Sequence, residues 1–256
     1  MKDHKEKKTT IVEIPQISNL ANRKEVSKKR QAKYREILKH SIEIIQEHGL
    51  GSLTLQAVAD KMNLQRPALY RYFISVRELW IAVQIDFKNE INNRMQELIN
   101  HHEGTYEELV FELFMFYYNW ITDDLARYLI LHDLDHGYAP GANKLGPIEK
   151  GYRPFDFILF FRYAIEKGIE NNEFKKNIDI SQWIFTLWSI IDGFIHSAVY
   201  FIVEPDNFSN PYYRVSDMSW VKVLKTRKKL FPNITRENLH NYVRNRIKDA
   251  INQIKI

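Results

Sequence analysis

Side chains that could bind a nucleic acid are concentrated between residues 65 and 72. Gln65 and Arg66 can each form two hydrogen bonds with one base edge, glutamine with adenine and arginine with guanine. The tyrosine hydroxyls of the same segment suit phosphate oxygens. A structural surface would more typically include a carboxylate, and this segment contains none. The side chains that we expect to face outward are Gln65, Arg66, Ala68, Tyr70, Arg71 and Tyr72.

Two short helices joined by a tight turn would position these side chains. Thr54 is a suitable N-cap for a helix over 55–61, and Pro67 is tolerated in the first turn of a helix that starts near residue 66. In the turn between them, asparagine at position 63 tolerates the left-handed backbone conformation. With a longer helix over about 27–48 before it, this pattern predicts a helix-turn-helix. Its apolar core would be Leu55, Val58, Ala59, Leu64, Leu69 and Phe73.

The rest of the chain also predicts helices and no strand. Nine glycines and eight prolines among 256 residues are few for an all-β fold with many tight turns. Apolar residues recur at helical spacing from Ser75 to about Asn100, and over about 105–122, 125–136, 154–170, 180–203, 217–230 and 236–254. We therefore expect an all-α chain in three parts: a flexible basic arm over 1–26, a three-helix helix-turn-helix domain over 27–75 and a helical domain over 76–256.

Charge and composition narrow the class of partner. Residues 1–75 carry 15 Lys/Arg against 8 Asp/Glu, residues 76–199 carry 11 against 19, and residues 200–256 carry 11 against 5. A basic N-terminal part beside an acidic middle favours a nucleic acid as partner.

The absence of cysteine excludes disulfides, iron–sulfur clusters and cysteine-ligated zinc. No stretch approaches the roughly 18–20 apolar residues of a membrane span, and the N-terminus lacks the apolar core of a secretory signal. We therefore expect a cytoplasmic protein with no membrane partner.

The segment TLQAVADKMNLQRPALYRYFISVREL, Thr54 to Leu79, resembles the N-terminal signature of TetR-family transcriptional regulators. The resemblance extends over roughly residues 30–85. It implies an all-α homodimer that binds an operator in double-stranded DNA and carries a divergent C-terminal domain for a small-molecule effector. It also implies phosphate contacts from Thr54, Tyr70 and Tyr72, and an approach to base edges by Gln65, Arg66 and Ala68.

The sequence departs from the family pattern at two places. The turn of the motif usually carries Ala-Gly and here reads Met62-Asn63. The family usually has a lysine at the start of the fourth helix, where this chain has Val76. Arg77 is adjacent but points about 100° away around the helix, so it does not replace that lysine directly.

Two apolar stripes in the C-terminal part could form the dimer interface. Asp192-Gly193 lies within the helix predicted over 180–203, and TetR-like proteins often show a similar Asp-Gly in the helix that begins their dimer bundle. Two such helices from each subunit would form a four-helix interface. The alternative is that both stripes pack inside one subunit. The second stripe is Leu239, Val243, Ile247 and Ile251, in the last predicted helix.

The acidic middle of the chain is rich in aromatic side chains, which can line a cavity for a flat apolar ligand or simply form a core. Our candidate effector contacts are Tyr117, Trp120, Phe161 and Trp188. The effector would be a small aromatic or lipophilic molecule. The local excess of carboxylates would also suit a cationic one, with Asp133 and Asp156 as candidates if they are buried.

His132 and His136 are spaced so that both imidazoles would share one face of a helix, as metal ligands require. No third ligand is identifiable, and Gly137 favours a helix end, where histidine is common. We also find no motif of nucleophilic or phosphate-transfer catalysis. We therefore expect no metal, no cofactor and no enzymatic activity.

The sequence thus predicts a ligand-responsive DNA-binding regulator, which in this family is most often a repressor. Effector binding would move the helix from Ser75 to about Asn100 and change the spacing of the two recognition helices in the dimer. Two alternatives stay open. One is an architectural DNA-binding protein or a regulator without a small-molecule effector. The other is an enzyme that uses the pair His132 and His136.

Overall fold

Helices make up the regular structure of the residues that the computed structural model describes, which are 28–48, 50–124, 146–151, 157–202, 225–227 and 229–256. Apart from an isolated bridge between Phe174 and Lys255, these ranges contain no strand. The predicted all-α fold is therefore confirmed. The α-helices are α1 (Lys28–His48), α2 (Leu55–Lys61), α3 (Arg66–Leu69), α4 (Val76–His101), α5 (Tyr106–Thr122), α7 (Pro147–Gly151), α8 (Ile158–Glu170), α9 (Ile180–Ile202) and α11 (Arg236–Ile254).

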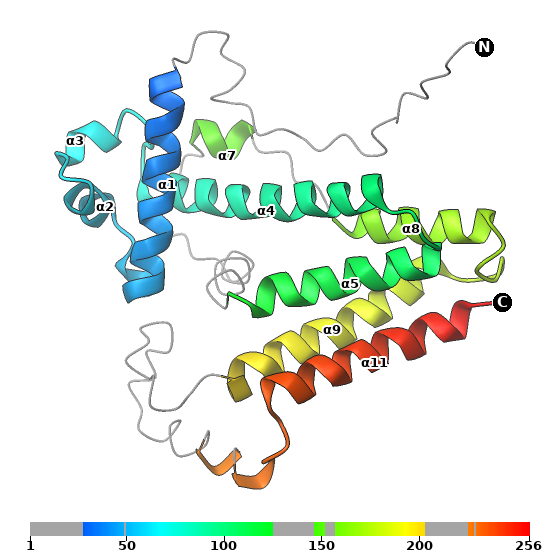
Figure 1. Cartoon of the computed structure of the whole chain (residues 1–256). Coiled ribbons are helices and arrows are strands. Elements are labelled where there is room, and N and C mark those ends of the chain that lie inside the picture. Colours follow the sequence, from blue (N-terminus) through cyan, green and yellow to red (C-terminus); the bar gives the residue numbers. More distant parts are fainter. Residues whose placement is uncertain (1–27, 49, 125–145, 152–156, 203–224, 228) are drawn as a thin grey trace, which may run out of the picture.

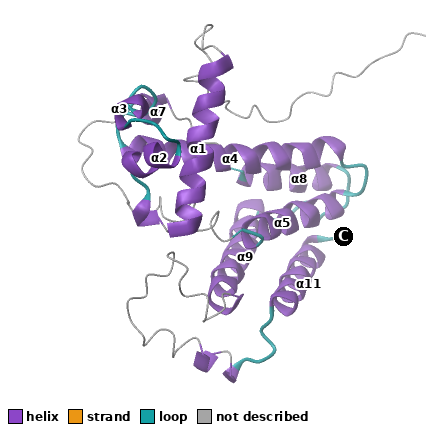
Figure 2. Cartoon of the chain, turned by 60° about the vertical axis from the view of Figure 1, so that its left-hand side comes forward, coloured by secondary structure: helices purple, strands orange, loops and turns teal. Residues whose placement is uncertain are grey.

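The N-terminal helices lie at one end of the molecule. In Figure 1, α1 stands across the first turns of α4, with α2 and α3 on one side of it and the C-terminal helices on the other. Figure 2, turned by 60°, again shows α2 and α3 together beside α1. The helices α2 and α3 thus lie on the far side of α1 from the bundle of α5, α8, α9 and α11.

Hydroxyl side chains fix where several helices begin. The side-chain oxygens of Thr54, Ser75, Thr105 and Thr235 each accept a hydrogen bond from a backbone N–H in the first turn of the helix that follows. Each bond satisfies one of the N–H groups that have no partner inside the helix. These caps explain why the predicted starts of α2, α4, α5 and α11 agree closely with the structure.

The central helix α4 is buried on all sides near its start. Every residue from Glu78 to Ile85 is buried, because α1, α5 and α7 pack around this part of the helix. Ser75, the last residue of the predicted helix-turn-helix domain, caps this helix. The two predicted domains therefore share a continuous core and are joined by a rigid element.

The apolar stripe of α11 packs inside the single chain, between α5 and α9. Its side chains are at most 3% exposed, because they complete the core of the C-terminal bundle. A side chain already buried in one chain offers no surface to a second copy. This burial favours the stated alternative, in which Leu239, Val243, Ile247 and Ile251 pack within one subunit.

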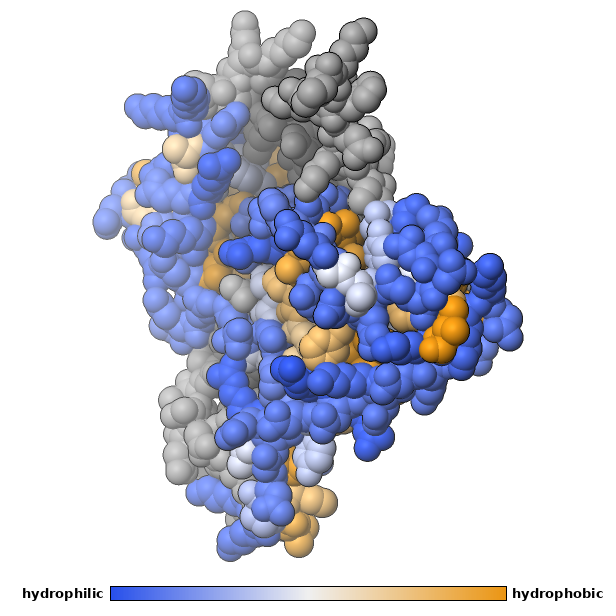
Figure 3. Space-filling view, turned by 45° about the vertical axis from the view of Figure 1, so that its right-hand side comes forward, coloured by the Kyte–Doolittle hydropathy of each residue, from blue (hydrophilic) through white to orange (hydrophobic). Residues whose placement is uncertain are grey.

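Hydrophilic side chains cover most of the face of the molecule in Figure 3, and apolar ones show through between the helices. None of the described helices combines the length and the apolar character that crossing a membrane requires. The arm predicted over 1–26 and the helix predicted over 125–136 lie outside the described residues, as does most of the helix predicted over 217–230.

Candidate nucleic-acid interface

A small apolar core fixes the angle between α2 and α3. Val58 and Ala59 from α2 and Leu69 and Phe73 from the second half of the motif are fully buried. The Phe73 ring stacks on Tyr34 of α1 with the ring centroids 5.4 Å apart. Because this core holds the motif from within, the remaining side chains of α3 are left to face outward.

The turn of the motif relies on the asparagine that replaces the usual glycine. Asn63 has a φ of 53°, in the left-handed region that asparagine and glycine adopt more readily than other residues. The next residue, Leu64, then donates its N–H to the Ala59 carbonyl at 2.8 Å. The sequence-based expectation for this turn is therefore confirmed.

Replacing Asn63 by valine should destabilise the protein by about 1–2 kcal/mol, because a β-branched residue is strained in the left-handed region. Replacing it by glycine should be neutral or stabilising, because glycine adopts this conformation freely. Chemical denaturation of the two variants measures the difference. Equal stability of Asn63→Val and Asn63→Gly would show that the turn does not need this conformation.

Five of the seven side chains predicted to contact DNA are exposed. Thr54, Gln65, Arg66, Tyr70 and Arg71 are exposed, and Ala68 and Tyr72 are half-buried. The set contains two cations, two phenols and no carboxylate. The oxygen of Thr54 accepts the cap bond from Ala57, which leaves its O–H free to donate to an oxygen of a bound molecule.

Arg66 is held in place by a neighbour one helical turn away. Its guanidinium donates a hydrogen bond to the Tyr70 hydroxyl at 2.8 Å and lies 5.6 Å from the centroid of the Tyr70 ring. A guanidinium restrained in this way loses less side-chain entropy when it forms a bidentate contact. The pair thus gives α3 an exposed and restrained hydrogen-bond donor.

A groove beside the motif adds cations that sequence reasoning did not single out. It has a volume of about 670 Å³ and is lined by Lys29, Arg30, Ala32, Lys33, Glu36, Arg71 and Tyr72. Arg30 donates to the Arg71 carbonyl at 3.0 Å and lies over the Tyr72 ring, so it ties α1 to the end of the motif. The lining carboxylate, Glu36, is paired with Lys33 at 2.9 Å. We call this surface the α1 groove, and its charge suits a phosphate.

Replacing Lys29 by alanine should weaken DNA binding about equally for all sequences, since a phosphate contact carries no base information. It should also lower the slope of log affinity against log salt by about 1. Binding titrations at several salt concentrations measure both effects. Lys39→Ala, which removes the same charge on α1 outside the groove, should leave the slope unchanged. A sequence-dependent loss in Lys29→Ala would contradict a phosphate contact.

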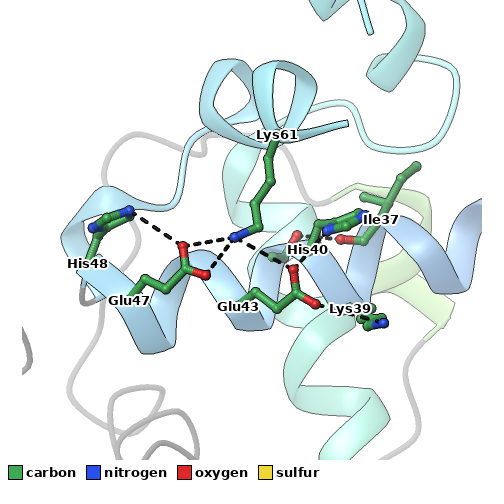
Figure 4. Close-up of polar contacts among 8 residues, drawn as sticks. Ile37, Lys39, His40, Glu43, Glu47, His48 and Lys61 are labelled. Carbon is green, nitrogen blue, oxygen red and sulfur yellow. Dashed lines mark hydrogen bonds and ion pairs between the residues drawn. The ribbon is translucent and has the colours of Figure 1, made fainter. Parts of the chain in front are cut away.

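An ion cluster holds α2 against α1 (Figure 4). The Lys61 ammonium, at the end of α2, lies 2.8 Å from Glu47 and 3.6 Å from Glu43 of α1. A hydrogen bond from His40 and the charge of Lys61 lower the pKa of Glu43, and the hydrogen bond to Glu47 raises the pKa of Lys61. Both pKa shifts favour the charged forms, so the ion pairs hold α2 against α1. They also pair the carboxylates of Glu43 and Glu47 with a cation.

Three of the four predicted effector residues lie together. Tyr117 of α5, Phe161 of α8 and Trp188 of α9 surround the Phe157 ring, with centroid distances between 4.5 and 6.4 Å along the cluster. Trp120 instead turns toward α4, where its indole N–H donates to Glu90 at 3.2 Å. We call the first group the aromatic cluster.

One face of α9 is exposed along its length. The residues on it follow at three- and four-residue steps, and Phe185, with 72% of its surface exposed, is unusually open for a large apolar side chain. At Gly193 an added Cβ would meet nothing within 4 Å, and Asp192 beside it is half-buried. We call this surface the α9 stripe. It consists of Gln182, Phe185, Ser189, Gly193 and His196.

The candidate metal ligands His132 and His136 and the candidate effector carboxylates Asp133 and Asp156 lie outside the described residues. Within the parts of the chain that are described, no group of three or more His, Asp or Glu side chains could hold a metal ion.

Part of the sequence matches a known protein family, and the fold resembles solved structures. Residues 37–83 match the family described as bacterial regulatory proteins, tetR family. No curated protein sequence matches the chain. A TetR transcription regulator from Haloarcula marismortui has a similar structure, with 15% identity over 88% of this chain and 100% of that one, and a TM-score of 0.57.

Two further solved structures resemble the fold. One is a TetR-family transcriptional regulator from Cytophaga hutchinsonii, with 15% identity over 91% of this chain and 99% of that one, and a TM-score of 0.55. The other is the regulator FadR from Bacillus subtilis in complex with stearoyl-CoA, with 17% identity over 75% and 97%, and a TM-score of 0.51. Residues 37–83 therefore match the tetR family of bacterial regulatory proteins, and the chain has the fold of solved TetR-family transcriptional regulators.

Proposed function

We propose that the protein is a dimeric repressor of transcription in the cytoplasm, which releases its operator when a small molecule binds to its C-terminal domain. The observation that carries this proposal is the exposed segment 65–71, where Gln65, the restrained Arg66 and Tyr70 are accessible and no carboxylate occurs. The α1 groove extends this surface with further cations.

A single helix-turn-helix reads one half-site, so specific binding requires two copies of the motif. The α9 stripe is the surface that we assign to the second copy. Two small residues, Ser189 and Gly193, allow close approach of two helices, and the exposed Phe185 would be buried on association.

The effector would be an aromatic or lipophilic molecule that enters between α5, α8 and α9 at the aromatic cluster. Rings there belong to three helices, so a ligand that separates them would change the packing of the whole bundle. The similarly folded FadR was solved with stearoyl-CoA, which supports a lipophilic ligand for this chain.

The alternative of a regulator without a small-molecule effector is favoured by one observation. The rings of Phe114 and Phe161 stack with their centroids 4.0 Å apart, as in an ordinary core. Thermal unfolding with a panel of aromatic and fatty-acyl compounds distinguishes the two. A compound that raises the unfolding temperature and weakens DNA binding supports the effector, whereas a panel without effect favours the alternative.

The test of DNA binding is a salt-titrated gel shift on the DNA upstream of the protein's own gene, beside a scrambled fragment. Selective binding that weakens steeply as salt rises is the expected result. Equal and weak binding to both fragments would argue against a specific operator there and favour the architectural alternative.

A further inference from the structure

A buried carboxylate joins the DNA-binding motif to the C-terminal domain. Glu78, in the first turn of α4, is 2% exposed. One of its oxygens accepts the backbone N–H of Ile74, at the end of the motif, at 2.7 Å. The other accepts the backbone N–H of Ile148, in α7, at 2.9 Å. A carboxylate is an acceptor only, so both of its oxygens are satisfied by amides from segments 74 residues apart in the sequence.

The contact with α7 is close packed. Gly146, just before α7, is buried, and a Cβ added to it would lie 2.4 Å from the Glu78 oxygen that accepts the Ile148 amide. Ile148 is also buried, in the same core as the first turns of α4. In Figure 1, α7 lies over the start of α4 beside α1. The segment 146–148 therefore fits against Glu78 with no room for a larger residue.

The charge of Glu78 also acts on Tyr34 of α1. Burial raises the pKa of the Tyr34 hydroxyl, and the charges of Asp86 and Glu78 act in the same direction. Tyr34 stacks on Phe73, which is two residues before the N-cap Ser75. Glu78 thus lies where α1, the end of the motif, α4 and α7 meet.

We propose that Glu78 is a positioning residue that couples α7 to the recognition segment, through its two hydrogen bonds to the amides of Ile148 and Ile74. A shift of α7 breaks the bond to Ile148, and the buried carboxylate is then left with an unsatisfied oxygen. It regains partners only by moving, which releases Ile74 and loosens the segment that follows α3. The two bonds therefore preorganise the motif for DNA.

This inference rests on the proposed function, because it assigns a route by which the C-terminal domain controls DNA affinity. Coupling of this kind is reciprocal. DNA bound at the motif should therefore protect the amides of α7.

The test uses Gly146→Ala, which leaves the sequence of the motif and Glu78 unchanged. The added Cβ must displace either the segment 146–148 or the Glu78 oxygen that accepts the Ile148 amide. Hydrogen exchange followed by mass spectrometry should show faster exchange in 146–151 and also in 73–78, which includes Ile74. Affinity for the DNA fragment selected in the gel shift should fall by about fivefold or more, within the usual range of coupling between sites. The matched control is Gly51→Ala, where the added Cβ meets nothing within 4 Å, and it should leave all three readouts unchanged.

Glu78→Gln provides a second variant that keeps the size of the side chain. Its amide retains one acceptor oxygen, so only one of the two segments should show faster exchange or both should show a partial increase. If Gly146→Ala changes exchange only in 146–151, or changes it nowhere, and DNA affinity stays at the wild-type value, the coupling is refuted. Failure of the wild-type protein to select any DNA would instead refute the proposed function, while exchange in the free protein would still report on the two bonds.

Discussion

Replacing Arg66 by alanine is expected to weaken binding to the preferred DNA site by about 1–3 kcal/mol, or about 5- to 150-fold. Arg66 is exposed at the start of α3, and its guanidinium is restrained by Tyr70. It can therefore donate two hydrogen bonds to one base edge. The variant should also lose preference at one base position. Binding to a library of single-base variants of the operator measures both effects.

Lys29→Ala is the control for Arg66→Ala, because a lost phosphate contact weakens all sequences alike. An unchanged base preference in Arg66→Ala would refute a base contact by Arg66. Tyr70→Phe removes the hydroxyl that accepts the Arg66 hydrogen bond. If Tyr70 acts through Arg66, the double variant should bind no more weakly than Arg66→Ala alone. Additive losses would indicate that Tyr70 has a separate contact with a phosphate.

Replacing Gly193 by arginine is expected to convert the proposed dimer into a monomer and to abolish selective DNA binding. A large charged side chain in the middle of the α9 stripe would prevent close approach of a second copy. Arginine is a better helix former than glycine, so the monomer should fold normally. A monomer presents one recognition helix, so its affinity should fall by about 10³-fold or more, to the level of non-specific binding. Light scattering after size exclusion, together with the gel shift, measures the two effects.

Asn93→Arg is the matched control, since Asn93 is exposed on α4 and receives the same side chain and charge. It should remain dimeric and bind DNA. A Gly193→Arg protein that is still a dimer would place the interface on another surface. A monomer with undiminished selectivity would refute the need for two copies.

The helix-turn-helix could be predicted from the sequence because its determinants are local. The Thr54 cap, Asn63 in the turn and the buried Val58, Ala59 and Leu69 all act within a few residues of one another. Local hydrogen bonds and helical spacing are visible in a sequence. The bounds of α2 were accordingly predicted to the residue.

Features that depend on distant pairs could not be predicted. Glu78 falls in the first turn of the helix predicted from Ser75, but its partner Ile148 lies 70 residues away. The five-residue α7 is too short to show a periodic pattern. Helical apolar spacing also does not distinguish an internal core from an interface, so the burial of Val243 within one chain could not be predicted from its spacing. The α1 groove has a visible pattern, since Lys29 and Lys33 are one helical turn apart, but the cavity forms only when α1 packs beside Arg71.

The continuous burial of α4 from Glu78 to Ile85 limits how this protein can be recombined with its relatives. A chimera that combines the recognition motif of one protein with the C-terminal bundle of another needs a residue at which the two sequences are joined. If the sequences are joined at Ser75, the eight native residues from Glu78 to Ile85 pack against side chains of α1 from the other protein. If they are joined beyond Ile85, these eight residues come from the other protein and pack against the native α5 and α7. New operator specificity is therefore more readily introduced by exchanging surface residues of α3 than by exchanging whole domains.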